Sequence, residues 1–473
     1  MYKKQVVFTK PRVQKITLNT FEGGVNNERV EGILNTGYAR YSYNFEYSSG
    51  ALKNGAGVDY MTILGKRFPF EKGVYPLNIY HYNRHITLTG ENDERYIIYA
   101  SDKNFYTLSL AKKEMTKIDG LTMEKAPVGL NYNLSGEDVY IFSKDGEGIV
   151  IINEDTFTDI VETPNISSMS MHSERLFITT KTDKKTLWFS DDFDPTNWQI
   201  SLDKAGFITL EDGLGDMLKV LSFSGYLFVF RTYGINQLSA YGSQEDFYTN
   251  QIVFGHGKIY GDTITDCGDY IVYLADDGLY RFNGVSSVKI MAEIDGSIVD
   301  GENARCCFSG GKFYLSTKIK FENDKIEKGV IVYNIKEKQG YILRHVNILS
   351  FCAVSGKERK ILCAVKGVNE VAILDDSGKV FGKNLKKVWQ SALNDFGIIS
   401  RRKRLDKISV ETDGNITLVV KSDYASKLFV VNGSGRQTIQ TNLFGSKFSF
   451  TFITYSGNPR IVKPVLYISY FED

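Results

Sequence analysis

Short apolar runs separated by turns recur along the middle of the chain, and most of them come in pairs. Each pair consists of an apolar-aromatic strand, a turn rich in glycine or charged residues, and a second strand, as in residues 175–180 with 186–190 and 270–274 with 278–282. The first strands of the pairs begin near residues 85, 138, 175, 226, 270, 312 and 360. The mean step is about 46 residues, which is typical of the blades of a propeller.

Weaker strands flank several of these pairs. Residues 218–223 precede one pair, and residues 287–290 follow another. Four short antiparallel strands repeated about seven times predict a β-propeller over residues 75–384, in which each sheet buries its faces against both neighbours and ring closure protects the edges. The alternative is a generic all-β protein whose strands have this spacing by coincidence.

Two regions lie outside the repeat. Residues 1–74 include a Tyr-rich stretch at 38–47, and an N-terminal strand in a ring-shaped fold often completes the last blade, so we expect this segment to close the propeller. From residue 385 onward five apolar runs alternate cleanly, which predicts a C-terminal β-sandwich over 385–473. These runs are residues 407–412, 415–420, 427–431, 448–453 and 465–470.

Composition supports an all-β protein and excludes several classes. Forty-three Gly against 8 Pro, with 29 Tyr and 30 Phe, favour many short strands and tight turns. Lys plus Arg total 57 and Asp plus Glu total 56, so no global charge points to nucleic acid or an anionic membrane. No apolar run approaches the ~18 residues of a membrane span, and the first residues lack the apolar core of a signal peptide.

Cysteine and histidine usage argues against an enzyme or a metal protein. The five cysteines are an odd number without a CxxC pair, which fits synthesis in a reducing cytoplasm better than a disulfide framework or a zinc site. HExxH, GxSxG and GxxxxGK[ST] motifs are all missing. We therefore expect no catalytic residues and no cofactor.

An acidic loop at residues 190–198 is the best candidate for a site. Asp191, Asp192 and Asp194 offer hard oxygens suited to Ca²⁺, and the loop is similar to the Asp-box turn of sialidase propellers, without that turn's central glycine. In the alternative interpretation, which we favour, the carboxylates cap a hairpin loop while Trp188 and Trp198 pack beneath it. We therefore predict no metal site.

Three sets of residues together resemble a known family. The N-terminal set is Phe21-Glu-Gly-Gly-Val-Asn26 with Ala39, Arg40, Asn44, Gly50-Ala-Leu-Lys53, Gly55 and Gly57. The second set is the acidic loop with its preceding strand, Leu187 to Trp198. The third set is a turn that precedes the basic C-terminal strands, Trp389-Gln-Ser391 with Asp395-Phe-Gly397. The combination covers most of the chain and resembles the propeller proteins of bacteriophage tails. The most similar functional class is the tail nozzle, or tail hub, of short-tailed phages.

The resemblance implies a structural virion protein. It would be a homo-hexameric ring at the distal end of the tail, made in the host cytoplasm, which closes and gates the DNA channel until DNA ejection. Its partners would be other tail proteins, such as the adaptor and tail fibre, and DNA that passes through the lumen without sequence recognition. Two alternatives remain: a receptor- or carbohydrate-binding propeller at the tail tip, and a glycan-cleaving propeller enzyme, which would need two facing carboxylates.

Charge is divided unevenly along the chain. From residue 385 onward 13 Lys plus Arg stand against 7 Asp plus Glu, whereas the remainder has 44 against 49. We therefore expect the C-terminal part to meet an acidic surface through Arg401, Arg402, Lys403 and Arg404. DNA is the weaker partner, because clustered phosphate contacts would hold a strand that must slide; a solvated basic face is the plain alternative.

Overall fold

The computed structural model describes residues 12–17, 21, 25–26, 38–84, 93–201, 204–242, 244–255, 257–321, 324–354, 360–398 and 401–470. Over these residues the chain is all-β, as expected. Its helical elements there are short 3-10 turns, among them Gln244–Asp246, Gly261–Thr263 and Ala292–Ser297. None of the described helical elements is long and apolar enough to cross a membrane.

The chain divides into two compact units. Unit 1 combines Met1–Asp59, Lys320–Val346 and Leu374–Asp473, and unit 2 combines Tyr60–Ile319 with Asn347–Ile373. The boundaries expected at residues 74 and 384 therefore do not coincide with these compact units, because residues 320–346 group with both terminal segments. As a description of functional domains, the division into 1–74, 75–384 and 385–473 stays a prediction.

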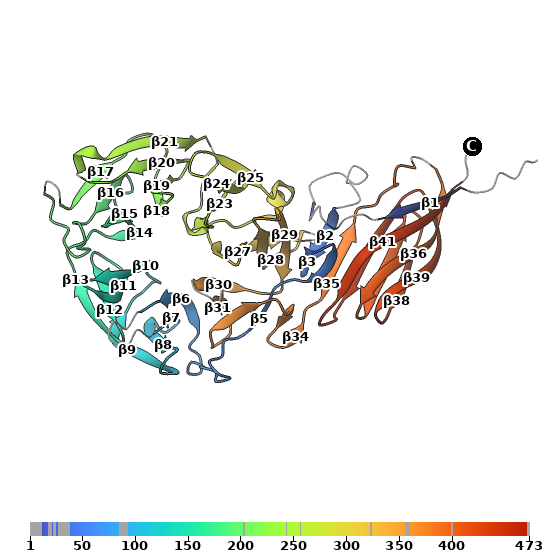
Figure 1. Cartoon of the computed structure of the whole chain (residues 1–473), viewed down its shortest axis with the longest axis horizontal. Coiled ribbons are helices and arrows are strands. Elements are labelled where there is room, and N and C mark those ends of the chain that lie inside the picture. Colours follow the sequence, from blue (N-terminus) through green and yellow to red (C-terminus); the bar gives the residue numbers. More distant parts are fainter. Residues whose placement is uncertain are drawn as a thin grey trace, which may run out of the picture. The chain divides into compact units, whose positions relative to one another are not determined.

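Unit 2 contains five four-stranded antiparallel sheets in its described residues, and they follow one another in sequence from light blue to yellow (Figure 1). Their strands are β6 (Pro76–Tyr82), β7 (Arg95–Ala100), β8 (Asn104–Ser109) and β9 (Glu114–Thr122); β10 (Gly129–Leu134), β11 (Glu137–Ser143), β12 (Ile149–Asn153) and β13 (Thr156–Ile160); β14 (Ile166–His172), β15 (Arg175–Thr180), β16 (Thr186–Phe189) and β17 (Gly206–Thr209); β18 (Met217–Phe223), β19 (Tyr226–Arg231), β20 (Gly234–Ser239) and β21 (Tyr248–Phe254); and β22 (Thr265–Asp266), β23 (Ile271–Ala275), β24 (Gly278–Phe282) and β25 (Ser287–Ile290). Two hairpins follow, β26 (Arg305–Ser309) with β27 (Lys312–Lys320) and β30 (Ile348–Val354) with β31 (Lys360–Val365).

The central strands of these sheets are apolar on both faces, and this pattern explains the packing of unit 2. Every residue of β7 and β15 is buried, whereas β13 is mostly exposed. Phe105 of one sheet packs on Phe142 of the next, with ring centroids 5.6 Å apart. Each such fully buried aromatic residue contributes about 1.5–3 kcal/mol relative to an exposed one. The architecture is therefore β-propeller-like, with neighbouring sheets packed face to face.

The paired runs of the sequence are the second and third strands of these sheets. The expected pairs match β11 with β12, β15 with β16, β19 with β20, and β23 with β24. The first expected pair includes residues 85–90, which fall outside the described residues; its second run, at 96–99, lies in β7, which pairs with β6 and β8. The polar residues Asn104, Thr107 and Ser109 of β8 had concealed its strand pattern.

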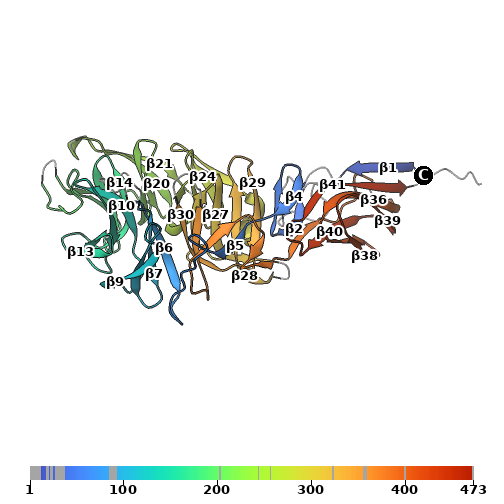
Figure 2. The same ribbon diagram turned by 60° about the horizontal axis from the view of Figure 1, so that its bottom comes forward.

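Unit 1 contains two larger sheets. The first has the order β3 (Phe45–Ser48), β4 (Ala51–Asn54), β41 (Arg460–Tyr470), β36 (Lys403–Asp413) and β39 (Gly435–Gly445), and β1 (Arg12–Thr17) pairs along β41 (Figure 2). The second has the order β2 (Ala39–Tyr43), β35 (Lys387–Ser391), β40 (Phe448–Thr454), β37 (Ile416–Ser422) and β38 (Ser426–Val431). The unit also holds the hairpin of β28 (Ile326–Asn334) and β29 (Gln339–Arg344), and β33 (Lys379–Val380) paired with β34 (Lys383–Asn384) and β5 (Gly57–Tyr60). In sequence, β32 (Ala372–Asp375) comes between β31 and β33.

The N-terminal strands have a role that the sequence did not indicate. β1 and β4 pair with β41, and β2 pairs with β35, so the first strands of the chain extend both sheets of its C-terminal part. Closure of the propeller by residues 1–74 stays a prediction.

Candidate functional site

The acidic loop is a turn whose carboxylates bind the loop's own donors. The Asp191 carboxylate accepts hydrogen bonds from the backbone N–H of Asp192 and from Nδ2 of Asn197, both at 2.9 Å. Asp194 Oδ1 accepts from the N–H and the hydroxyl of Thr196 at 2.9 and 2.6 Å. Asp192 turns away to Arg175, whose Nε lies 2.8 Å from its Oδ1. The three carboxylates therefore have separate partners.

This geometry agrees with the capping interpretation of the loop. Trp198 is only 6% exposed, and its indole N–H donates to the carbonyl of Pro195 at 2.8 Å. Within the described residues no three His, Cys, Asp or Glu side chains come together in a way that could hold a metal ion. The loop fixes Trp198 against its blade-like sheet.

Three further residues with potentially reactive side chains, His172, Cys306 and Cys352, also lie in surroundings that favour a structural role. His172 is buried with Nδ1 2.8 Å from the Ser222 hydroxyl, and burial lowers its pKa. Burial raises the pKa of the Cys306 and Cys352 thiols to about 12, and a thiol that stays protonated is a poor nucleophile. His85 and His256 lie outside the described residues.

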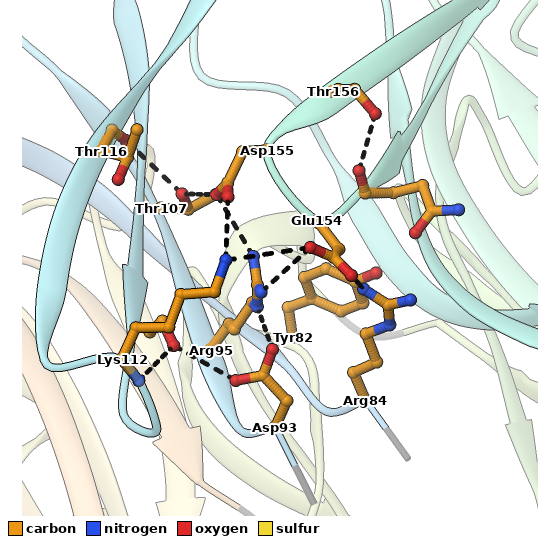
Figure 3. Close-up of polar contacts among 12 residues, drawn as sticks. Tyr82, Arg84, Asp93, Arg95, Thr107, Lys112, Thr116, Glu154, Asp155 and Thr156 are labelled. Carbon is orange, nitrogen blue, oxygen red and sulfur yellow. Dashed lines mark hydrogen bonds and ion pairs between the residues drawn. The ribbon is translucent and has the colours of Figure 1, made fainter. Parts of the chain in front are cut away.

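A cluster of charges in unit 2 surrounds a buried arginine (Figure 3). Arg95 is 1% exposed, and its guanidinium lies 2.5 Å from Asp93, 3.2 Å from Asp155 and 3.5 Å from Glu154. Lys112 approaches the same Glu154 and Asp155 at 4.0 and 3.9 Å. Because Glu154 and Asp155 follow β12, this cluster connects the β6–β9 sheet to the next sheet.

The cluster is balanced in charge, and this indicates a structural role. Arg84 pairs with Glu154, and the Thr107 hydroxyl donates to Asp155, so three cations face three carboxylates (Figure 3). Arg231 in another sheet is buried in the same manner, with Asp212 at 3.0 Å. The sequence offered little signal for these sites, because Asp155, Glu154 and Asp212 are far in sequence from the arginines that they contact, and only Asp93 lies next to its partner.

Two of the three sets of residues that carry the family resemblance meet inside unit 1, whereas the third, Leu187 to Trp198, belongs to unit 2. The Phe21 ring packs edge-on against Trp389 with centroids 4.8 Å apart, and the N–H of Asn26 donates to the carbonyl of Ala39 at 2.8 Å. Asn44 is 1% exposed at φ +61°. Its side chain donates to the Lys386 carbonyl at 2.8 Å and accepts from the N–H of Arg344 at 2.7 Å.

Two glycines of the same motif are required by close approach of other chain segments. A Cβ on Gly55 would lie 2.7 Å from the Tyr341 ring and 3.1 Å from the Asn44 carbonyl oxygen. A Cβ on Gly57 would lie 2.4 Å from the side chains of Asp375 and Ser377. The motif therefore connects distant segments of unit 1; it does not line a site.

A buried lysine belongs to the same region. Lys387 is fully buried, and its ammonium group donates to the carbonyl of Ser456 at 3.1 Å and to those of Gly378 and Leu385 at 3.4 Å. Burial lowers the pKa of this group to about 8.

We expect Lys387 to give the protein a distinctive dependence of stability on pH. Between about pH 8 and about pH 10.4 the unfolded chain keeps a proton on this lysine that the folded chain has released, so stability rises with pH. Urea unfolding across this range should show that rise for the wild-type chain relative to Lys387→Met. Parallel pH profiles for the two proteins would contradict the shifted pKa.

The basic stretch divides into an inward and an outward part, because β36 alternates its faces. Lys403 is 1% exposed, and its ammonium group donates to the carbonyls of Asp395 at 2.9 Å and Ile398 at 2.6 Å. It therefore does not face a partner. Arg402 and Arg404 are exposed, and Arg401 is half-buried; for these three, a protein–protein contact stays a prediction.

Two exposed aromatic residues accompany the outward arginines. The Arg402 guanidinium lies 5.6 Å from the ring centre of Phe444 and 5.9 Å from that of Tyr424, and Arg404 lies 6.0 Å from Phe444. Phe444 is 49% and Tyr424 70% exposed. We call these four residues the Arg–aromatic patch. Sequence reasoning missed Phe444, although its outward position in the alternating β39 was the available signal.

Comparison with known proteins gives no family for this chain. No protein-family model matches it, and no curated protein matches it. Similar folds among solved structures include BBS1N in complex with ARL6DN (13% identity over 64% of this chain and 92% of that chain, TM-score 0.40). Others are Raptor of Chaetomium thermophilum (8% identity, 71% and 29%, TM-score 0.45) and the extracellular domain of the putative hybrid two component system BT4673 from B. thetaiotaomicron (9% identity, 72% and 42%, TM-score 0.40).

Proposed function

We propose that this chain is a structural virion protein, the nozzle or hub subunit of a short phage tail. In this role it forms an oligomeric ring that closes the DNA channel and opens for ejection. The observation that carries the proposal is the meeting of the motif residues in unit 1. Phe21 contacts Trp389, and Asn44 bonds to Arg344 and Lys386, so two of the three sets that carry the resemblance belong to one connected framework.

The proposed fold is a seven-bladed propeller with a C-terminal β-sandwich. The five complete sheets of unit 2 are five blades, and the hairpins β26–β27 and β30–β31 begin the sixth and seventh. The two larger sheets of unit 1 form the sandwich; both have inward rows of apolar residues, such as Leu405, Ile408 and Val410 in β36 and Leu418 and Val420 in β37.

The placement of the candidate chemistry supports a structural role over an enzymatic one. Asp191, Asp192 and Asp194 are bound by loop donors and Arg175, and the Arg95 cluster balances its own charges. We infer that the chain has no catalytic residues and no cofactor, and that adaptor and fibre proteins and the passing DNA are its partners in the virion.

A receptor- or carbohydrate-binding role at the tail tip is the second candidate. It is favoured by exposed aromatic residues of unit 2, among them Tyr241 at 81% and Tyr248 at 63% exposure, because aromatic faces suit sugar stacking. Binding of the purified chain on a glycan array, abolished by alanine at both positions, would support this candidate.

We expect the purified chain to assemble into rings. Mass photometry at physiological salt should give a species of six 53.4 kDa chains, and negative-stain microscopy should show a ring with a central channel. A monomer at every concentration would contradict the nozzle proposal, and so would a filament that never closes.

A further inference from the structure

The two units carry large and opposite charges. Unit 1 contains 29 Lys and Arg against 18 Asp and Glu, a net charge of +11, whereas unit 2 contains 28 against 38, a net charge of −10. The chain as a whole has a net charge of only +1. Two copies that meet through like units therefore repel, and two copies that meet through unlike units attract.

The Arg–aromatic patch has the composition of a contact surface. Tyr, Phe and Arg are enriched in the buried core of protein interfaces, whereas Lys and Glu are depleted there. A few residues in that core contribute most of the binding free energy. The guanidinium group of Arg402 lies over two exposed rings, Tyr424 and Phe444, and no carboxylate in the described part of the chain pairs with it. A partner carboxylate that reaches Arg402 would gain a charge-assisted bond and cover both rings.

We propose that the Arg–aromatic patch of one chain docks on the acidic unit 2 of a second copy. The contact is heterologous, since different surfaces of the two copies meet, and repetition of such a contact closes into a ring when the rotation allows it. This inference rests on the proposed function, because it names the surface and the partner that join neighbouring subunits of the ring.

The surface is better suited to a protein carboxylate than to DNA. Arg404 already pairs with Asp406 at 2.5 Å, and Lys403, the central cation of the stretch, is buried with its ammonium group bound to carbonyls. What remains outward is Arg402 over two aromatic rings with the paired Arg404 beside it, a compact surface without the row of cations that tracks a phosphate backbone.

The experiment compares two double variants of the full chain. Arg402→Ser with Arg404→Ser removes two positive charges from the patch. Lys383→Ser with Lys463→Ser removes two exposed positive charges elsewhere in unit 1 and serves as the matched control. Sedimentation velocity at about 50, 150 and 500 mM NaCl gives the dissociation constant of each protein, because surface attraction is screened over about 10 Å at 0.1 M salt.

We expect the patch variant to weaken self-association about 30-fold or more, as for loss of an interface hot spot, and the control to weaken it only slightly. A third variant, Phe444→Ala with Tyr424→Ala, should reproduce the loss with no change of charge. Circular dichroism verifies that each variant is folded.

The outcomes separate this inference from the function it rests on. If the wild-type chain does not associate at any salt concentration, the ring itself is contradicted. If it forms rings that the patch variant forms equally well, the docking surface is wrong and the ring stands. Equal weakening by the patch variant and the control would assign the effect to net charge alone and would also overturn the inference.

Discussion

Replacing Arg95 by methionine should lower the free energy of unfolding by about 3–5 kcal/mol. The substitution leaves Asp93 buried without its cation, since Asp93 is 4% exposed and its only other side-chain bond described is the 3.2 Å contact with the Ser109 hydroxyl. An uncompensated buried carboxylate costs far more than the ion pair itself contributes. Urea unfolding followed by tryptophan fluorescence measures the loss.

Lys112→Met provides the matched control for Arg95→Met. Lys112 approaches the same two carboxylates, but its side chain is 48% exposed and its contacts are 3.9–4.0 Å long. Its removal should cost less than about 1 kcal/mol, as for other surface ion pairs. Equal losses for the two variants would show that the cluster acts through general electrostatics and not through the buried guanidinium.

Asn44→Ala should destabilise unit 1 by about 3–4 kcal/mol. The alanine leaves the Lys386 carbonyl and the Arg344 N–H without the partners they have at 2.8 and 2.7 Å, and each unsatisfied buried group costs about 1–3 kcal/mol. It also places a residue less tolerant of φ +61° at this position, which adds about 1 kcal/mol. Thermal unfolding measured by calorimetry gives the loss.

Asn44→Gly separates these two contributions. Glycine adopts a positive φ without strain but also lacks the side-chain amide, so it should recover about 1 kcal/mol of the loss. A loss below about 1 kcal/mol for Asn44→Ala would show that the amide bonds do not hold the segments of unit 1 together.

Strands could be predicted where both faces are buried and less well where one face meets solvent. The pairs formed by β15 with β16 and β23 with β24 are almost entirely buried and each strand holds an apolar run, so their sequences alone identify them. β39 escaped prediction because all its residues up to Gln440 except the half-buried Ile439 are polar or exposed, and only Thr441, Leu443 and Gly445 are buried. β8 was missed for a related reason, since polar residues such as Thr107 are buried by hydrogen bonding to Asp155.

The residue types of the candidate site could be predicted from the sequence, but the directions in which their side chains point could not. Four consecutive basic residues suggested one cationic surface, but strand alternation sends Lys403 inward between Arg402 and Arg404. Two partners of Arg95, Glu154 and Asp155, come from another sheet, so no spacing in the sequence reveals them, although Asp93 is only two residues away. In the acidic loop, by contrast, donors and acceptors are close in sequence, and the hydrogen bonds of the loop agree with the capping interpretation.

The construction of unit 1 from three separate segments determines when it can form during synthesis. Ala39 pairs with Ser391, and Arg12 pairs with Tyr470. The strands β1 and β2 are therefore synthesised long before their partners β41 and β35, and they cannot form these pairs until synthesis has reached those partners. Closing such long loops is slow, and until then β2 and β4 have open edges that invite pairing with other chains. Unit 2, whose hairpins are local, can fold meanwhile. A fragment of residues 385–473 expressed alone would lack β2, β3 and β4 and expose the flanks of β35 and β41, so a soluble version needs the N-terminal strands supplied in the same chain or as a peptide.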